Sequence, residues 1–258
     1  MANAGLIIPA WPDAPANVGA LATTRVGGFS AGPYGDGGGG GGLNLGLHVG
    51  DDGETVRRNR ALLQQSLPGR PAWIAQVHGV AVADAGAVRP GEPATVADAS
   101  IARAPGVVCA VLTADCLPVL FADIDGKVVG AAHAGWRGLA AGVLGATLAA
   151  MRAAGAGEIT AWLGPAIGPR RFEVGEDVRD AFSAALGAQV AAPAFLPYDG
   201  RPGKYLADMP LLARAFLARD GVNSVAGGEH CTASDEAQFY SYRRDGVSGR
   251  QATLIWLK

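Results

Sequence analysis

The sequence has few cysteines and lacks both a leader-like N-terminus and a long apolar run. Its three cysteines, Cys109, Cys116 and Cys231, form an odd and low number that argues against a disulfide framework and favours a reducing compartment. The N-terminus has no basic segment, and prolines follow its short apolar run, so we expect no signal peptide. No segment reaches the roughly 20 apolar residues of a membrane-spanning helix. We therefore predict a cytoplasmic protein that does not contact the membrane.

An excess of charge of one sign is also missing. The chain has 21 basic and 23 acidic residues and a formal net charge of -2. This balance gives no electrostatic signal for nucleic-acid binding, so we expect no nucleic-acid partner. Apolar residues make up 49% of the chain and charged residues 17%, which is typical of a chain that buries a substantial core. We predict a single domain spanning residues 1–258.

A glycine-rich tract, GDGGGGGG, occupies residues 35–42. It could be mistaken for a phosphate-binding loop. No Gly-Lys-Ser/Thr follows it and no apolar strand precedes it, and both are required in a P-loop. We interpret the tract as a flexible surface loop, because glycine gives up the most conformational entropy when it is ordered.

Hydrophobic patterns predict an alternation of strands and helices. The segments with helical signals lie at 54–67, 135–155, 176–187 and 207–221. Strands are predicted at 71–77, 106–114 and 251–257, and 118–133 is expected to form a hairpin with an Asp-Gly turn. Because hairpins and helices are mixed without a regular βαβ repeat, we predict an α+β fold with mixed β-sheets flanked by helices.

Three residues with metal-binding side chains stand at or near the ends of predicted strands: His78, Cys116 and His133. They are separated by 38 and 17 residues, which are not the short paired spacings of a structural zinc finger. Imidazole and thiolate are good ligands for zinc or copper, and three protein ligands leave a fourth position open for catalysis. Glycines at 79, 135 and 138 would allow the backbone to turn tightly around the site.

Two other interpretations of these residues remain open. In a metal-free cysteine hydrolase, Cys116 would be the nucleophile and His78 or His133 the base. Asp115 would be a poor third member, because neighbouring strand residues point to opposite faces. In a non-catalytic binding protein, all of these side chains would be structural.

Ordered motifs along nearly the whole chain resemble the YfiH (laccase-domain) family. These motifs are TTRVGGFS (23–30), LNLGLHVGDD (43–52), QVHG (76–79), TADCLPVL (113–120), AAHAGWRG (131–138), LGPAIGP (163–169), FEVG (172–175) and CTASDEAQFYSYRRDGVSGRQATLIWL (231–257). The resemblance implies a compact α+β domain with one zinc ion bound by His78, Cys116 and His133. It also implies Arg25, the arginine of TTR, as an anion-binding residue.

The activities described for such proteins differ in their chemistry. They are purine nucleoside phosphorylase, with adenosine deaminase and methylthioadenosine phosphorylase activities, peptidoglycan editing of muropeptide precursors, and polyphenol oxidation. Copper sites are rich in imidazole, but this chain has four histidines and no His-X-His pair. None of its three methionines lies near a ligand motif, as a blue-copper site would require. We therefore favour zinc over copper and nucleosides over phenols.

The expected substrates are a purine nucleoside and phosphate. Arg25 lies in a glycine-rich turn, where a guanidinium and backbone amides could hold phosphate, although it could also be a surface arginine. Asn44 could bind ribose or shape a turn, and Arg244 could close the anion site. Deamination would also need a carboxylate for proton transfer, and both Asp98 and Asp115 are candidates.

Overall fold

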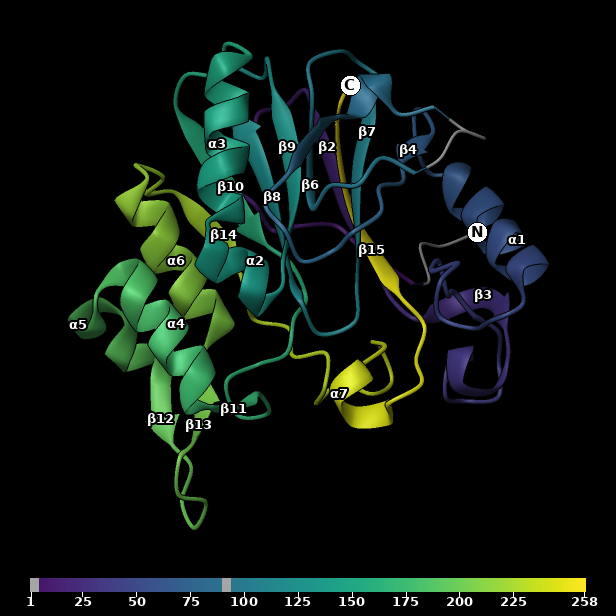
Figure 1. The fold of residues 1–258 in the computed structure, drawn as a ribbon. Helices are drawn as coiled ribbons and strands as arrows, with labels where there is room; N and C mark the ends of the chain where they lie inside the picture. Colours follow the sequence, from purple (N-terminus) through teal and green to yellow (C-terminus); the bar gives the residue numbers. More distant parts are fainter. Residues whose placement is uncertain (1–4, 90–93) are drawn as a thin grey trace.

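Two mixed β-sheets stack face to face in the computed structural model, which describes residues 5–89 and 94–258 (Figure 1). The five-stranded sheet has the order β1 (Leu6–Ile7), β2 (Val18–Thr23), β15 (Gln251–Leu257), β7 (Val108–Thr113) and β4 (Pro71–Ala72). The six-stranded sheet has the order β14 (Val225–Gly227), β10 (Ile159–Leu163), β8 (Leu117–Asp123), β9 (Val129–Ala134), β6 (Ala99–Ala102) and β5 (Val82–Asp84). Each sheet combines parallel and antiparallel pairs, which confirms the predicted α+β class with mixed sheets.

Strand β7 illustrates how the layers are built, because all six of its residues are buried. Successive side chains on a strand point to opposite faces. Cys109 and Val111 accordingly pack between the two sheets, against Leu120 and Val129 of the six-stranded sheet. The intervening residues pack in a separate cluster with Leu63 of the first helix. The continuous apolar run therefore predicts a strand that is covered on both faces.

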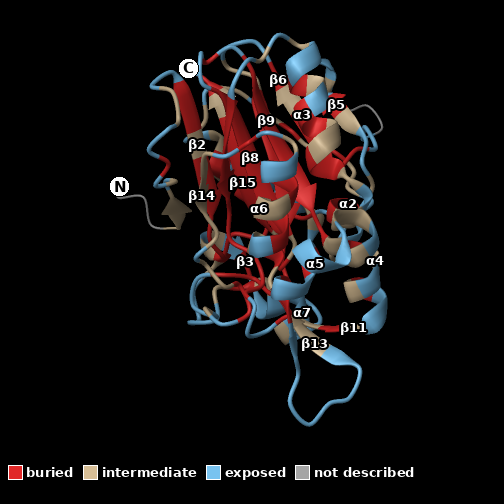
Figure 2. Ribbon diagram, turned by 90° about the vertical axis from the view of Figure 1, so that its left-hand side faces the viewer, coloured by how far each residue is buried: buried red, intermediate tan, exposed pale blue. Residues whose placement is uncertain are grey.

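Helices cover the outer faces of the two sheets, on opposite sides of the molecule in Figure 1. On the five-stranded side lies α1 (Gly53–Gln64). On the six-stranded side lie α2 (Trp136–Ala141), α3 (Val143–Ala153), α4 (Glu176–Leu186) and α6 (Met209–Arg219). Figure 2 shows the strands as the buried centre, with exposed residues mainly on helices and loops. None of the helices in the described part of the chain has the length and apolar character needed to cross a membrane.

Smaller elements complete the fold. A three-stranded antiparallel sheet has the order β11 (Glu173–Gly175), β13 (Lys204–Ala207) and β12 (Phe195–Pro197). The other short elements are β3 (Val26–Ser30), α5 (Ala188–Ala191), α7 (Tyr242–Asp245) and the 3-10 turns at Gly32–Tyr34, Ala85–Ala87 and Ala192–Ala194. Helix α7 contributes residues to two cavities that are described below.

Several predicted elements form where they were expected. Helix α1 begins after Asp52, whose carboxylate accepts a hydrogen bond from the Thr55 amide and so caps the helix. Strand β15 covers the predicted residues 251–257. The predicted hairpin forms from β8 and β9, and Gly126 in its turn has a φ of 68°.

Two predicted elements are wrong in extent. The long helix expected at 135–155 is divided into α2 and α3, because Gly142 adopts a left-handed φ of 99° and ends the first helix. The strand expected at 71–77 is reduced to β4 at 71–72 and an isolated bridge between Ala75 and Val96. Beyond that bridge, the backbone amides of Val77 and His78 donate to a carboxylate instead of a neighbouring strand.

The glycine-rich tract is exposed at residues 37–40 but is packed at its end. The Asp36 carboxylate accepts hydrogen bonds from the amides of Gly38 and Gly40. A Cβ atom added at Gly41 would lie 2.0 Å from the Gly28 carbonyl oxygen, and one at Gly42 would lie 1.9 Å from that of Tyr34. The last two glycines are therefore required by close backbone contacts.

Candidate metal centre

The structure brings His78, Cys116 and His133 together. Their potential ligand atoms all lie within 4.8 Å of one another. The Cys116 Sγ and His78 Nε2 atoms are 3.6 Å apart, and the two imidazole rings meet edge to face at a centroid distance of 4.7 Å. His133 is buried, Cys116 is half-buried and His78 is exposed. The cluster therefore has one side in the core and one side open to a ligand.

Each of the three residues is placed by a specific backbone feature. Cys116 lies where the chain leaves β7 in one sheet and enters β8 in the other, after Asp115 with its left-handed φ of 89°. His133 lies on β9 and pairs with Pro118 of β8. His78 itself has a φ of 62°, an uncommon value for a residue with a side chain. Such strained conformations are concentrated at functional sites.

A buried carboxylate positions two of the candidate ligands. Asp98 is fully buried, and its Oδ1 atom lies 2.8 Å from His133 Nδ1. The same carboxylate accepts hydrogen bonds from the backbone amides of Val77, His78 and Gly79, at 3.2, 2.8 and 2.6 Å. Burial raises the pKa of Asp98, but these contacts outweigh it and hold the pKa below its usual value. With Nδ1 bonded to Asp98, His133 presents Nε2 to the cluster.

The cluster strongly favours positive charge beside a thiolate. Burial raises the pKa of the Cys116 thiol, but hydrogen bonds with His133 and His78 outweigh it and lower the pKa to about 6. Burial lowers the pKa of His133, but contacts with Asp98 and Cys116 outweigh it and raise the pKa to about 9. The same field that stabilises a proton on His133 would stabilise a metal cation at the cluster.

Gly135 keeps this cluster compact. A Cβ atom at position 135 would lie 2.6 Å from His78 Cδ2 and 3.2 Å from Cys116 Sγ. Any larger side chain would push the ligands apart. The prediction that a flanking glycine permits close approach therefore has a direct structural reason at Gly135.

The cluster opens into a cavity of about 730 Å³, which we call the reaction cavity. Its lining residues are Leu47, His48, Arg60, Trp73, Ile74, Ala75, Gln76, His78, Ala94, Leu112, Thr113, Ala114, Cys116, His133, Tyr242 and Arg250. Aromatic and aliphatic side chains form much of the wall, as in typical small-molecule sites. The volume is within the usual range of about 300–1,000 Å³ for ligand cavities.

Two arginines give the reaction cavity a cationic wall. Arg60 donates to the Leu45 carbonyl, and its guanidinium lies over the Trp73 ring at 4.2 Å. Arg250 donates to backbone carbonyls at positions 248 and 249. Neither guanidinium has a carboxylate partner among the residues that the structure describes. Burial together with Arg250 and Arg60 lowers the pKa of His48, which favours its neutral form in this cavity.

The three residues predicted to bind substrate do not line the reaction cavity. Arg25 is buried and donates to the carbonyls of Gly35 and Glu236, with its guanidinium 5.0 Å from the Tyr240 ring. Asn44 shapes a turn through the Gly46 amide and also accepts from the Arg250 amide, so it positions a cavity residue. Arg244 lies in a different pocket.

The two candidate carboxylates for proton transfer are both engaged elsewhere. Asp98 holds His133 and the backbone at 77–79, as described above. Asp115 accepts hydrogen bonds from the Thr232 hydroxyl and the Arg243 amide, at 2.6 and 2.7 Å. Neither carboxylate is a lining residue of the reaction cavity. Both carboxylates therefore hold neighbouring residues in place through hydrogen bonds.

Sequence reasoning missed Arg60, Arg250 and Trp73 as cavity residues. Arg60 is one of several arginines on α1, and only its burial distinguishes it from exposed neighbours such as Arg57. Arg250 had a usable signal, because it directly precedes a predicted strand and a polar residue at a strand end can face a site.

Comparisons with known proteins identify the family of the chain. Residues 19–258 match the family model described as multi-copper polyphenol oxidoreductase laccase. A Pseudomonas aeruginosa protein named purine nucleoside phosphorylase is 52% identical over 254 residues, covering 98% of each chain. The Escherichia coli protein named purine nucleoside phosphorylase YfiH is 49% identical over 256 residues, also covering 98% of each chain.

Solved structures show the same fold. The crystal structure of a Neisseria meningitidis protein superposes with a TM-score of 0.90 at 49% identity and covers 98% of this chain and 99% of that one. The crystal structure of YlmD from Geobacillus stearothermophilus gives a TM-score of 0.83 at 32% identity, covering 100% of this chain and 98% of that one. The family match, the sequence identities and the shared fold therefore show that the chain belongs to the YfiH family of laccase-like proteins.

Proposed function

We propose that this protein is a zinc-dependent purine nucleoside phosphorylase of the cytoplasm. The observation that carries the proposal is the reaction cavity, which places the His78–Cys116–His133 cluster around one space with two arginines, Arg60 and Arg250. Neither arginine has a carboxylate partner in the part of the chain that the structure describes. The names of the relatives support it, since two of them at 49% and 52% identity are called purine nucleoside phosphorylases.

The donor set of the cluster fits zinc. Zinc binds sulfur at about 2.3 Å and imidazole nitrogen at about 2.0–2.1 Å, so two such ligands of one tetrahedral ion are about 3.5 Å apart. The separation of 3.6 Å between Cys116 Sγ and His78 Nε2 is consistent with this spacing. The lowered pKa of Cys116 supplies the thiolate that a metal requires near neutral pH. When bound, zinc would supply a Lewis acid with an open coordination position beside the substrate.

The chain's own residues would bind and orient the two substrates. Arg60 and Arg250 offer paired N–H groups to the phosphate anion. Trp73 and Ile74 offer apolar surface to a flat purine and exclude water around it. In phosphorolysis, a phosphate oxygen forms a bond to ribose C1′ while the C1′–N9 bond breaks. The bond electrons then leave with the purine, which takes up a proton.

We rank adenosine deamination and methylthioadenosine phosphorolysis below this reaction. Deamination would need a carboxylate facing the cavity, whereas Asp98 and Asp115 are bonded to other groups. Methylthioadenosine differs from adenosine only at the ribose 5′ position, and the bond that is cleaved is the same. It is therefore assayed together with adenosine and inosine.

The proposal is tested with one protein batch whose metal content is measured. Zinc-loaded protein given inosine or adenosine with phosphate should release free base and ribose 1-phosphate. The same protein given a phenolic dye and oxygen should show no oxidation unless copper is added. Robust phenol oxidation by the zinc-only protein, with nucleosides untouched, would overturn the proposal. Full activity of metal-free protein would instead favour the thiolate mechanism. If nucleosides and phenols both fail, amide-bearing cell-wall precursors are the next substrates to assay.

A further inference from the structure

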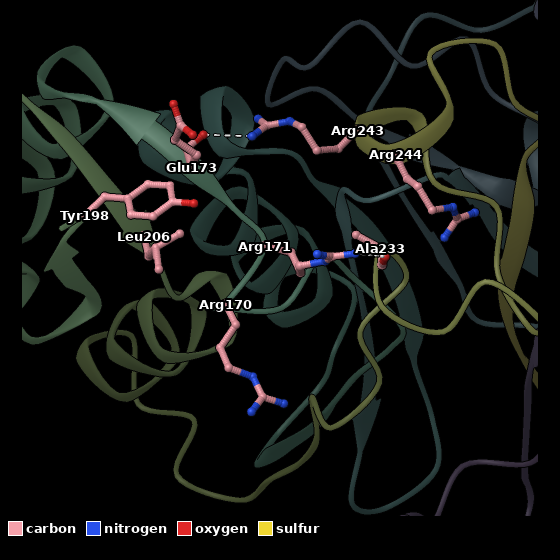
Figure 3. A pocket seen from close by; sticks show the side chains of 8 residues that line it. All are labelled: Arg170, Arg171, Glu173, Tyr198, Leu206, Ala233, Arg243 and Arg244. Carbon is pink, nitrogen blue, oxygen red and sulfur yellow. Dashed lines mark hydrogen bonds between the residues drawn. The ribbon is translucent and has the colours of Figure 1, made fainter. Parts of the chain in front are cut away.

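A second pocket lies on the other side of α7 from the reaction cavity. It has a volume of about 280 Å³ and is lined by Arg170, Arg171, Glu173, Tyr198, Leu206, Ala233, Arg243 and Arg244 (Figure 3). We call it the arginine pocket. Its residues come from four places: the loop before β11 and β11 itself, the segment around β12 and β13, the loop at Ala233, and α7.

The positive charge of the arginine pocket is only partly neutralised. Its one lining carboxylate, that of Glu173, is paired with Arg201. Asp245 pairs with Arg244 at 2.7 Å. Arg170, Arg171 and Arg243 have no carboxylate partner within residues 5–89 and 94–258.

Backbone carbonyls hold two of these guanidinium groups, those of Arg171 and Arg243, without cancelling their charge. Arg171 donates to the Ala233 carbonyl at 3.3 Å, and Arg243 donates to the Glu173 carbonyl at 2.8 Å, as drawn in Figure 3. Each guanidinium has five N–H groups, so most of them remain free for a ligand. Cations gathered around one small space repel one another, and a bound anion would relieve that repulsion.

The other wall of the pocket has a different character. Tyr198, which is 37% exposed, and Leu206 offer ring and aliphatic surface next to the arginines. A ligand with an anionic end and a small organic body would contact both walls. The pocket lies near the lower end of the usual volume range of about 300–1,000 Å³, which suits a small ligand.

We propose that the arginine pocket binds the phosphate group of a small phosphate ester, a nucleotide or a sugar phosphate, at a site separate from the reaction cavity. Arginine binds phosphate through paired N–H groups. The separation is set by α7, whose Tyr242 lines the reaction cavity while its next two residues line the arginine pocket.

Calorimetric titration of the full-length protein at low salt tests the proposal. The probes are ribose 5-phosphate, adenosine monophosphate and inorganic phosphate, added separately. Both esters should bind saturably and more tightly than inorganic phosphate. If adenosine monophosphate binds with higher affinity than ribose 5-phosphate, and Tyr198→Ala abolishes this difference in affinity, the ligand is a nucleotide. Equal affinities of the two esters would identify the sugar phosphate.

Matched arginine variants locate the site. Arg170→Gln and Arg243→Gln should each weaken ester binding about tenfold, because a charge-assisted contact is lost. Arg57→Gln, on the exposed face of α1, and Arg60→Gln, in the reaction cavity, should leave ester binding unchanged. Thermal melting checks that each variant is folded. Arg170→Gln should fold normally, because Arg170 is exposed and has no hydrogen-bond partner in the described chain.

Three results would overturn the proposal. The first is the absence of saturable ester binding. The second is inorganic phosphate binding as tightly as both esters in the Arg60→Gln protein, where the reaction cavity is weakened, since the organic wall of the arginine pocket would then contribute nothing. The third is ester binding that is lost in Arg60→Gln and kept in Arg170→Gln and Arg243→Gln, which would place the ligand in the reaction cavity.

Discussion

The two pockets on either side of α7 hold their charged groups in different ways. In the reaction cavity, the cluster is fixed from behind, because Asp98 bonds both the His133 ring and the backbone of His78. In the arginine pocket, Arg171 and Arg243 each donate one hydrogen bond to a carbonyl and keep free N–H groups. Arg244 is held more firmly, by two carbonyls and by Asp245. A preorganised cluster suits chemistry that depends on geometry, whereas exposed cations with free N–H groups suit attraction of an anion. Substitutions should therefore cause abrupt losses in the first pocket and graded losses in the second.

The largest effect is expected at Cys116. Cys116→Ala removes the thiolate, so the purified variant should contain essentially no zinc and show no phosphorolysis. Metal analysis and product chromatography on the same sample measure both losses. Cys231→Ala is the matched control, because Cys231 is also half-buried but lies outside the cluster. Zinc retained by Cys116→Ala at the wild-type level would contradict the cluster as the metal site.

Asp98→Asn should have the next largest effect. The amide keeps the size of the carboxylate but replaces one acceptor oxygen by a donor and removes the charge that orients His133. Zinc affinity should fall about 10- to 100-fold, as for other residues that orient metal ligands. Competition with a chelator measures this affinity. Asp84→Asn is the control, since among the described residues Asp84 accepts only from the Gly86 amide on an exposed turn. If the zinc affinity is unchanged in Asp98→Asn, Asp98 does not position the ligands of the cluster.

Arg60→Gln should have a smaller and more selective effect. Loss of one charge-assisted contact should raise the KM for phosphate about tenfold and leave zinc content unchanged. Initial rates at varied phosphate and fixed inosine give this constant. The comparison with Arg25→Ala decides between two predicted anion ligands, because Arg25 is bonded to carbonyls outside the reaction cavity. If the KM for phosphate rises more in Arg25→Ala than in Arg60→Gln, Arg25 is the phosphate-binding residue.

The smallest expected effect is that of ionic strength, which should weaken ester binding in the arginine pocket but leave zinc binding in the reaction cavity unchanged. Raising salt from about 0.05 to about 0.5 M shortens the screening length from roughly 14 to roughly 4 Å, so ester binding to the exposed arginines should weaken several-fold. Zinc content should not change, because its bonds are short and partly buried. Calorimetry at the two salt concentrations, with metal analysis, makes the comparison. If the affinity for the esters did not change with salt, the exposed arginines would not be the groups that bind them.

The sequence predicts the elements whose signals are local. The apolar run of β7 and the cap at Asp52 need only their own neighbourhoods, and both form as expected. The break at Gly142 was missed because small residues on both sides continue a helical pattern. The predicted strand before His78 was too long because its amides bond to Asp98, which is 20 residues away in the chain.

The candidate site divides in the same way. His78, Cys116 and His133 could be proposed together because the chain has only four histidines and three cysteines, and because the motifs that contain them resemble those of the YfiH family. Arg60 and Arg250 could not, because arginines are common and the cavity that selects two of them forms only when α1 and β15 are both in place. The role of Asp98 as a positioning residue likewise depends on contacts with His133 and with residues 77–79, which are distant from it in the sequence.

Strand β15 has a consequence for how the protein is made. It lies between β2 and β7, so residues 18–23 and 108–113 are joined by a segment at 251–257. On the ribosome, the two outer strands emerge long before the strand that pairs with both. Arg250 immediately precedes that strand, so the wall of the reaction cavity is completed at the same late moment. A nascent chain stalled before residue 250 would therefore lack both the central strand of its sheet and the Arg250 side of its cavity.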